Sequence, residues 1–174
     1  MRVVVYQIEK HEKVIYNLGL LLDKVCLSGK KIGILCDKDN INDIDRGLWT
    51  FSTHAFLPHN VATHQAEQDI NTKENDIQPV LLTDDAVDVV NRDVLCVLSL
   101  EDIKTLSTVL ANVDNMNEDG EIEKDIIYIT YDNIVDDIKN IFPLAQIDVY
   151  KKTNGRWQKG QFWFDNKTGK VLYY

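Results

Sequence analysis

Short apolar segments alternate with amphipathic segments along this chain, and that alternation constrains the fold more than any other feature. The apolar segments are short and rich in β-branched residues, as buried strands are. They comprise Arg2–Ile8, Lys31–Cys36, Pro79–Leu82, Asp93–Leu100 and Asp125–Thr130. Helical spacing predicts helices over Lys10–Leu27, Ile41–Trp49, Asp102–Val113 and Asn133–Phe142. Because strands that alternate with helices favour a largely parallel sheet, we expect a Rossmann-like, three-layer α/β/α fold.

The C-terminal end has a different character. From Lys151 to Tyr174 there are six basic residues and one acid, a local charge of +5, and aromatic residues lie between the charges. Gln161–Phe164 and Lys170–Tyr174 flank a turn-forming segment, which predicts a β-hairpin. We therefore expect an α/β domain over residues 1–157 and a basic, aromatic hairpin extension over 158–174, packed on or beside that domain.

Length and charge restrict the class of protein. A chain of 174 residues with 44% hydrophobic content can bury one ordinary core. A net charge of −9 argues against a direct grip on a nucleic-acid backbone, which depends on Lys and Arg. The three dispersed cysteines are typical of reduced thiols in a cytoplasmic protein, and neither a signal peptide nor a membrane span is expected.

The segment from Ser28 to Ala62 carries the most specific pattern. A strand ends at Cys36-Asp37, a helix ends with Leu48-Trp49, and a compact string, Phe56-Leu57-Pro58-His59-Asn60, follows. The segment offers no nucleophile, phosphate-binding loop or metal cage, and neither GxGxxG nor GxxxxGK[ST] occurs in the chain. The pattern therefore indicates binding rather than chemistry.

In spacing and residue type this segment closely resembles the chi subunit family of bacterial DNA polymerase III. The residues that carry the resemblance, with no gap between Trp49 and Ala62, are Cys36, Asp37, Leu48, Trp49, Phe56, Pro58, His59, Asn60 and Ala62. Weaker patterning extends the likeness over roughly residues 1–157. The resemblance implies an α/β fold and a non-catalytic accessory subunit of the clamp-loader complex in DNA replication, without a cofactor.

The resemblance also implies a site for a protein partner. Chi subunits hold the psi subunit, and the region around Phe-x-Pro-His is implicated in that contact, which here gives Trp49, Phe56, Pro58 and His59. The expected partner is psi, another clamp-loader component or a helicase. Aromatic rings beside a proline-fixed backbone make a rigid anchor of the kind found at binding hot spots. The alternative is that Trp49 and Phe56 are core residues.

A second implied partner is the acidic C-terminal tail of single-stranded-DNA-binding protein, through which contact with DNA would be mainly indirect. Such a tail requires cations beside an apolar pocket. Family members carry these cations largely on the helix after the last core strand, where this chain offers Lys139 beside Asp136 and Asp137. Either the basic C-terminal segment replaces that site, or a group of five residues forms it, namely Ile129, Tyr131, Lys139, Lys151 and Lys152.

Two other functions are compatible with the sequence. Asp37, Asp39 and Asp84 follow predicted strands and could hold Mg²⁺ in a phosphoryl-transfer or nuclease-like enzyme. The alternative for Asp37 and Asp39 is that they cap the helix that follows. The C-terminal hairpin could instead bind single-stranded nucleic acid through its aromatic and basic residues, or simply pack on the domain.

Overall fold

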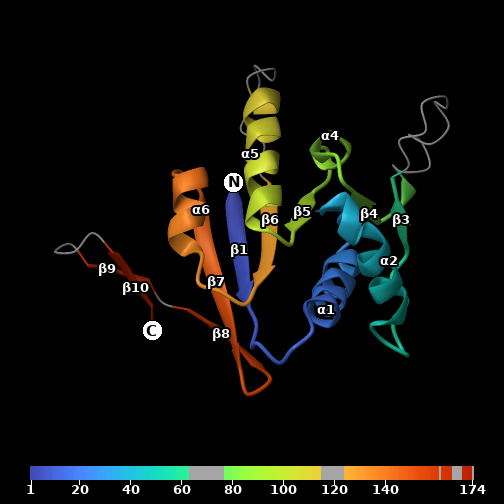
Figure 1. Ribbon diagram of the computed structural model, residues 1–174, viewed down its shortest axis with the longest axis horizontal. Helices are drawn as coiled ribbons and strands as arrows, with labels where there is room; N and C mark the ends of the chain where they lie inside the picture. Colours follow the sequence, from blue (N-terminus) through green and yellow to red (C-terminus); the bar gives the residue numbers. More distant parts are fainter. Residues whose placement is uncertain (63–76, 115–123, 161, 166–169, 174) are drawn as a thin grey trace.

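A central sheet of eight strands organises the molecule (Figure 1). The computed structural model describes residues 1–62, 77–114, 124–160, 162–165 and 170–173. In the order β3-β4-β2-β5-β6-β1-β7-β8, neighbouring strands are parallel except for β7 and β8. The strands are β1 Arg2–Gln7, β2 Ile32–Leu35, β3 His59–Val61, β4 Val80–Thr83, β5 Val94–Val97, β6 Asp125–Thr130, β7 Gln146–Thr153 and β8 Arg156–Lys159.

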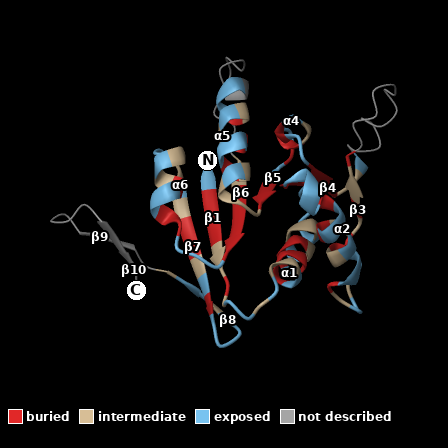
Figure 2. Ribbon diagram, viewed as in Figure 1, coloured by how far each residue is buried: buried red, intermediate tan, exposed pale blue. Residues whose placement is uncertain are grey.

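Helices cover both faces of this sheet, so the predicted three-layer α/β fold is confirmed. One core cluster joins the sheet to α1 and α2, and the other joins it to α4, α5 and α6. Buried residues accordingly line the sheet-facing sides of the helices (Figure 2). The described helices are α1 Val14–Leu27, α2 Ile41–Thr50, α4 Ala86–Val89, α5 Leu100–Asp114 and α6 Val135–Ile141, with a short 3₁₀ turn at Lys38–Asn40. None of those described helices is long and apolar enough to cross a membrane.

Alternation along the strands explains the two clusters. Leu95 and Val97 of β5 pack on the side of α5, whereas Val94 and Cys96 pack on the side of α1. This is the two-residue period expected of a strand that is buried on both faces. The predicted apolar segments therefore became strands of the central sheet, where helices bury both of their faces.

Local backbone and side-chain hydrogen bonds define where α1 ends and where the 3₁₀ turn before α2 begins. Gly29 ends α1 with a φ of +78°, and its N–H donates to the Cys26 carbonyl at 2.9 Å. After β2, the Asp37 carboxylate accepts from the Asp39 N–H at 3.2 Å and starts the 3₁₀ turn. Of the acids after β2, Asp37 thus caps the 3₁₀ turn.

Several elements differ from the sequence prediction. The first helix begins at Val14 rather than Lys10, because the preceding residues form a turn in which the Glu12 N–H donates to the Glu9 carbonyl. Strands β3, β7 and β8 and the single-turn helix α4 were not predicted. The sequence also predicts polar surface loops at Ala62–Gln78 and Asn115–Lys124, and both segments lie almost entirely outside the described residues.

The turn of the β7–β8 hairpin has a recognisable sequence pattern, an Asn-Gly pair. Asn154 and Gly155 lie between the two strands with φ values of +51° and +73°. An Asn-Gly pair is the preferred chemistry for a two-residue hairpin turn with two left-handed positions. The same signal could have extended the predicted sheet to β8.

The predicted C-terminal hairpin is also present. β9, Phe162–Asp165, pairs antiparallel with β10, Lys170–Tyr173, in a separate two-stranded sheet. The expected boundary at residue 158 falls within β8, which belongs to the main sheet.

Candidate partner-binding surface

Two large aromatic side chains lie exposed beside one another where α2 leads into β3. Trp49, in the last turn of α2, is 52% exposed, and Phe56, in the connection that follows, is 67% exposed. Their ring centroids are 5.6 Å apart. The neighbouring Leu48 and Leu57 are instead buried in the core, so the fold separates core residues from the aromatic pair. We call the group formed by Trp49, Phe56, Pro58 and His59 the Trp49–Phe56 surface.

Buried contacts hold this surface in place. The ring of His59 is buried and lies 4.7 Å from the Trp49 ring, centroid to centroid. Its Nδ1 is 2.7 Å from the Leu57 carbonyl, which can only accept, so Nδ1 is the donor. Its Nε2 lies 3.2 Å from the Asp45 carboxylate, an ion pair when the ring carries both protons.

The backbone around Phe56 is fixed on both sides. Pro58 restricts the chain just before β3, whose His59 pairs with Val80 of β4. On the other side, the Ser52 hydroxyl accepts from the N–H groups of His54 and Ala55 at 3.2 Å each. The structure therefore brings the four sequence-predicted residues together on an anchored segment.

The five residues expected to hold the acidic tail are distributed differently. Ile129 is buried in the core beneath α1. Lys152 is 9% exposed, and its Nζ lies 2.5 Å from the Glu12 carboxylate and 2.9 Å from the Asn17 side-chain oxygen. Both side chains are thus buried, and the ammonium group of Lys152 already has partners within the molecule.

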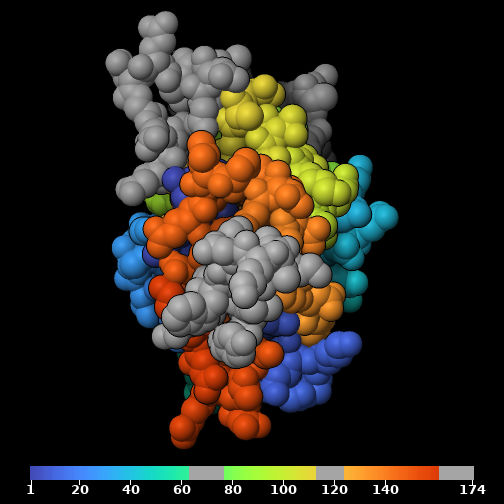
Figure 3. Space-filling model, turned by 90° about the vertical axis from the view of Figure 1, so that its left-hand side faces the viewer, coloured from blue at the N-terminus to red at the C-terminus, as the bar shows by residue number. Residues whose placement is uncertain are grey.

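The other three residues of that group are not buried, and two of them, Lys139 and Lys151, lie toward opposite ends of β7. Tyr131 is exposed at the end of β6, and its hydroxyl donates to the Glu12 carbonyl at 2.8 Å. Lys139 is in the last turn of α6, toward the amino end of β7, whereas Lys151 is exposed near the carboxyl end of that strand. Figure 3 shows the side of the molecule formed by α6 and β7, from which the β7–β8 turn protrudes.

The carboxylates considered for Mg²⁺ do not form a metal site in the described ranges, where no group of three or more His, Cys, Asp or Glu side chains could hold a metal ion. A depression of about 300 Å³ lies at the carboxyl ends of β2 and β5 and is lined by Asp37, Asp43 and Asp102. Asp102 belongs to a capping box, in which its carboxylate accepts from the Ser99 N–H at 3.1 Å. Burial raises the pKa of this carboxyl group, which weakens it as a ligand for a cation.

An aromatic cluster on the sheet was missed by the sequence analysis. Tyr6 of β1 stacks on Tyr150 of β7 with centroids 5.3 Å apart, and Trp157 of β8 meets Tyr6 edge-on at 5.1 Å. Tyr6 and Tyr150 are register partners of parallel strands. Predicting β7 and the Asn-Gly turn would have placed all three rings on one face.

The comparison with known families agrees with the N-terminal part of this picture. The family model described as "DNA polymerase III chi subunit, HolC" matches residues 1–125. The matched part contains the complete Trp49–Phe56 surface and ends at the first residue of β6. No curated protein sequence matches the chain. Because the family model covers well over half of its length, the chain belongs to the DNA polymerase III chi subunit family.

Proposed function

We propose that this protein is a non-catalytic accessory subunit of the replicative DNA polymerase III holoenzyme, docked to the psi subunit or another clamp-loader component through the Trp49–Phe56 surface. The observation that carries the proposal is the exposed ring pair of Trp49 and Phe56 on an anchored segment. Family membership supports an accessory role in replication. A helicase is the alternative partner for the same surface.

The energetics of such a contact favour a tight interface. An aromatic side chain can bury about 150–250 Å², and more than half of each of these two side chains remains available. Hot spots of this kind contribute about 2 kcal/mol or more each. The hydrogen bonds of Ser52 and His59 already fix the segment, so little further ordering is required on binding.

Titration calorimetry with the purified psi subunit of the same organism tests this proposal. Phe56→Ala and Trp49→Ala should each weaken binding by about 30-fold, the equivalent of 2 kcal/mol. Tyr16→Ala removes an aromatic ring of similar exposure, 47%, from α1 and should leave affinity unchanged. Wild-type affinity in folded Phe56→Ala would refute docking at this surface, and unfolding of that variant would place Phe56 among the structural residues.

We propose further that the protein links the polymerase to single-stranded-DNA-binding protein in the cytoplasm by holding its acidic C-terminal tail. Tyr131, Lys139 and Lys151 remain the accessible members of the predicted site, and residues 158–174 are the alternative. Contact with DNA would then be mainly indirect, in keeping with the net charge of −9.

Fluorescence anisotropy with a labelled peptide of that tail tests the second proposal. At low salt, where charge attraction is strongest, Lys151→Glu should weaken binding at least five-fold. Lys104→Glu on α5, the same change of charge on an exposed residue, should not. Truncation after Gly160 distinguishes the C-terminal alternative, and absence of binding to the full chain would remove the proposal altogether.

A further inference from the structure

Asp45 lies one helical turn before Trp49 on α2, next to the Trp49–Phe56 surface. Residues four positions apart occupy the same face of a helix, so the Asp45 carboxylate borders the exposed Trp49 ring. The Asp45 side chain is 34% exposed, and its Oδ1 lies 3.2 Å from Nε2 of His59, whose side chain is fully buried. The carboxylate is therefore open to solvent on one side and backed by the His59 ring on the other.

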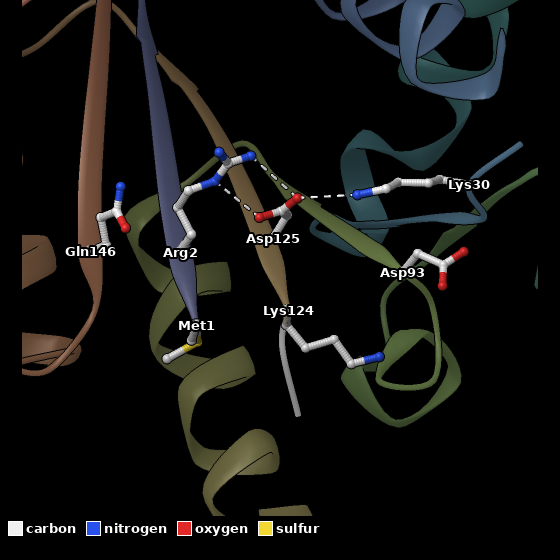
Figure 4. Close-up of a pocket in the computed structure, with 7 residues that line it drawn as sticks. All are labelled: Met1, Arg2, Lys30, Asp93, Lys124, Asp125 and Gln146. Atoms are coloured by element: carbon white, nitrogen blue, oxygen red, sulfur yellow. Dashed lines mark hydrogen bonds and ion pairs between the residues drawn. The ribbon is translucent and has the colours of Figure 1, made fainter. Parts of the chain in front are cut away.

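Figure 4 shows how this protein pairs a carboxylate of similar exposure. The Asp125 side chain is 26% exposed, and Arg2 and Lys30 reach it from two sides, with nitrogen–oxygen distances of 3.1 Å and 3.3 Å. Lysine and arginine keep their positive charge throughout the neutral range of pH. Within the part of the chain that the structure describes, Asp45 instead faces His59, and histidine changes its charge between about pH 5 and 8. The Asp45 carboxylate can therefore accept a permanent cation from outside the chain.

The hydrogen bonds of the His59 ring determine how much of the Asp45 charge remains. Nδ1 donates to the Leu57 carbonyl at 2.7 Å, so a neutral ring carries its single proton there. Nε2 then carries no proton, and it has no hydrogen-bond partner among the described residues. A neutral His59 thus leaves Asp45 with its full negative charge, whereas a ring with both protons forms an ion pair with it.

Among the described residues, other charges around the His59 ring are few. β4, which pairs with β3, carries no charged residue over Val80–Thr83. In the connection from α2 to β3 the titratable residue is His54, whose Nδ1 lies 2.8 Å from the hydroxyl of the preceding threonine. Arg46, the next residue of α2, pairs at 3.7 Å with an exposed aspartate one turn earlier. Asp45 is therefore the group through which protonation of His59 can act.

We propose that Asp45 is a recognition residue of the docking surface. It accepts hydrogen bonds from an arginine or lysine of the partner, whose apolar side chains cover the Trp49–Phe56 surface, and the protonation of His59 weakens this contact. Charge complementarity supports a basic partner segment, because residues 37–50 carry four aspartates and two cations in a chain of net charge −9. This inference rests on the proposed docking of a replication partner at the same surface.

Titration calorimetry with the purified psi subunit at low salt and about pH 8 tests the role of Asp45. Asp45→Asn should weaken binding about five-fold, the upper range for a partly exposed ion pair, and should make the affinity less dependent on salt. Asp43→Asn is the matched control, because it removes the same charge from α2 at a position that is 80% exposed and paired with Arg46. Its affinity should stay close to that of the parent protein.

The pH dependence separates recognition from a purely structural role of Asp45. Lowering the pH to about 6, where histidine begins to gain its second proton, should bring the affinity of the parent protein toward that of Asp45→Asn. The affinity of Asp45→Asn itself should change less over the same range. The salt dependence of the parent protein should also be smaller at the lower pH, a comparison that needs no variant.

The outcomes distinguish this inference from the proposed function. Parent affinity in Asp45→Asn, with weakened binding in Phe56→Ala, would overturn the inference and leave the docking surface intact. Equal weakening by Asp45→Asn and Asp43→Asn would assign the effect to overall charge, and identical pH profiles of parent and Asp45→Asn would remove the role of His59. Parent affinity in Phe56→Ala, or no binding of psi at all, would refute the docking proposal and this inference with it.

Discussion

Lys152 provides a sharp test, because its position decides whether it is a structural residue or a ligand for an acidic tail. Its ammonium group is enclosed by the Glu12 carboxylate and the Asn17 side chain, and it lies 5.5 Å from the centroid of the Trp157 ring. Lys152→Met keeps much of the side-chain volume but removes the charge. Glu12, only 15% exposed at its side chain, then loses its cation.

The expected cost follows from that burial. Removing one partner of a fully buried ion pair costs about 3–5 kcal/mol. Because the Glu12 and Lys152 side chains both retain a little exposure, we expect the lower end, about 3 kcal/mol. For a domain of this length each kcal/mol lowers Tm by about 2–4 °C, so Lys152→Met should melt about 6–12 °C below the parent protein.

Differential scanning calorimetry of five proteins checks this reasoning: the parent, Lys152→Met, Glu12→Gln, the double variant and the control Lys151→Met. Lys151→Met, at the adjacent exposed position of β7, is the matched control and should change stability by no more than about 0.5 kcal/mol. The double variant with Glu12→Gln should be less destabilised than the sum of the single changes, with a coupling of about 1–3 kcal/mol. A Tm of Lys152→Met within 2 °C of the parent, or zero coupling, would refute a structural pair.

Three further predictions concern packing, titration and the C-terminal extension. A Cβ on Gly33 would lie 2.4 Å from the Val89 Cβ, so Gly33→Ala should cost about 1–3 kcal/mol in urea unfolding. Burial raises the pKa of the Cys36 and Cys96 thiols from 9.0 to about 12. Between pH 9 and pH 12 the folded state therefore binds more protons than the unfolded state. The free energy of unfolding should then fall as the pH rises above 9, by up to about 1.4 kcal/mol per pH unit for each thiol. Replacing both cysteines by alanine should flatten that slope, and an unchanged slope would contradict the assignment. Truncation after Gly160 should leave Tm within 2 °C if residues beyond it form an extension of the α/β domain, whereas a larger loss would make them part of its core.

The fold was predictable where one physical signal dominated. The strands β1, β2, β4, β5 and β6 are buried on both faces and therefore appear as short apolar runs. β7 was not predicted because Asp148, Lys151 and Lys152 interrupt the alternation of apolar and polar residues that is typical of a strand. β3 has three residues and α4 has four, too few for either to display a period.

In the candidate sites, some residues are as exposed as the sequence predicted and others are buried. The exposure of Phe56 and Trp49 was consistent with the sequence pattern, but His59 was expected on the surface and instead supports it from beneath. Lys152 was expected to be available as a cation and is held inside the molecule. Pairing of a lysine with residues 135 or more positions away depends on tertiary packing, and no local pattern reveals it.

The limit of the family match sharpens the functional argument. Residues 1–125 contain the Trp49–Phe56 surface, whereas Ile129, Tyr131, Lys139, Lys151 and Lys152 all lie beyond them. The proposed partner docking thus rests on the part of the chain that matches the family, and the tail contact does not.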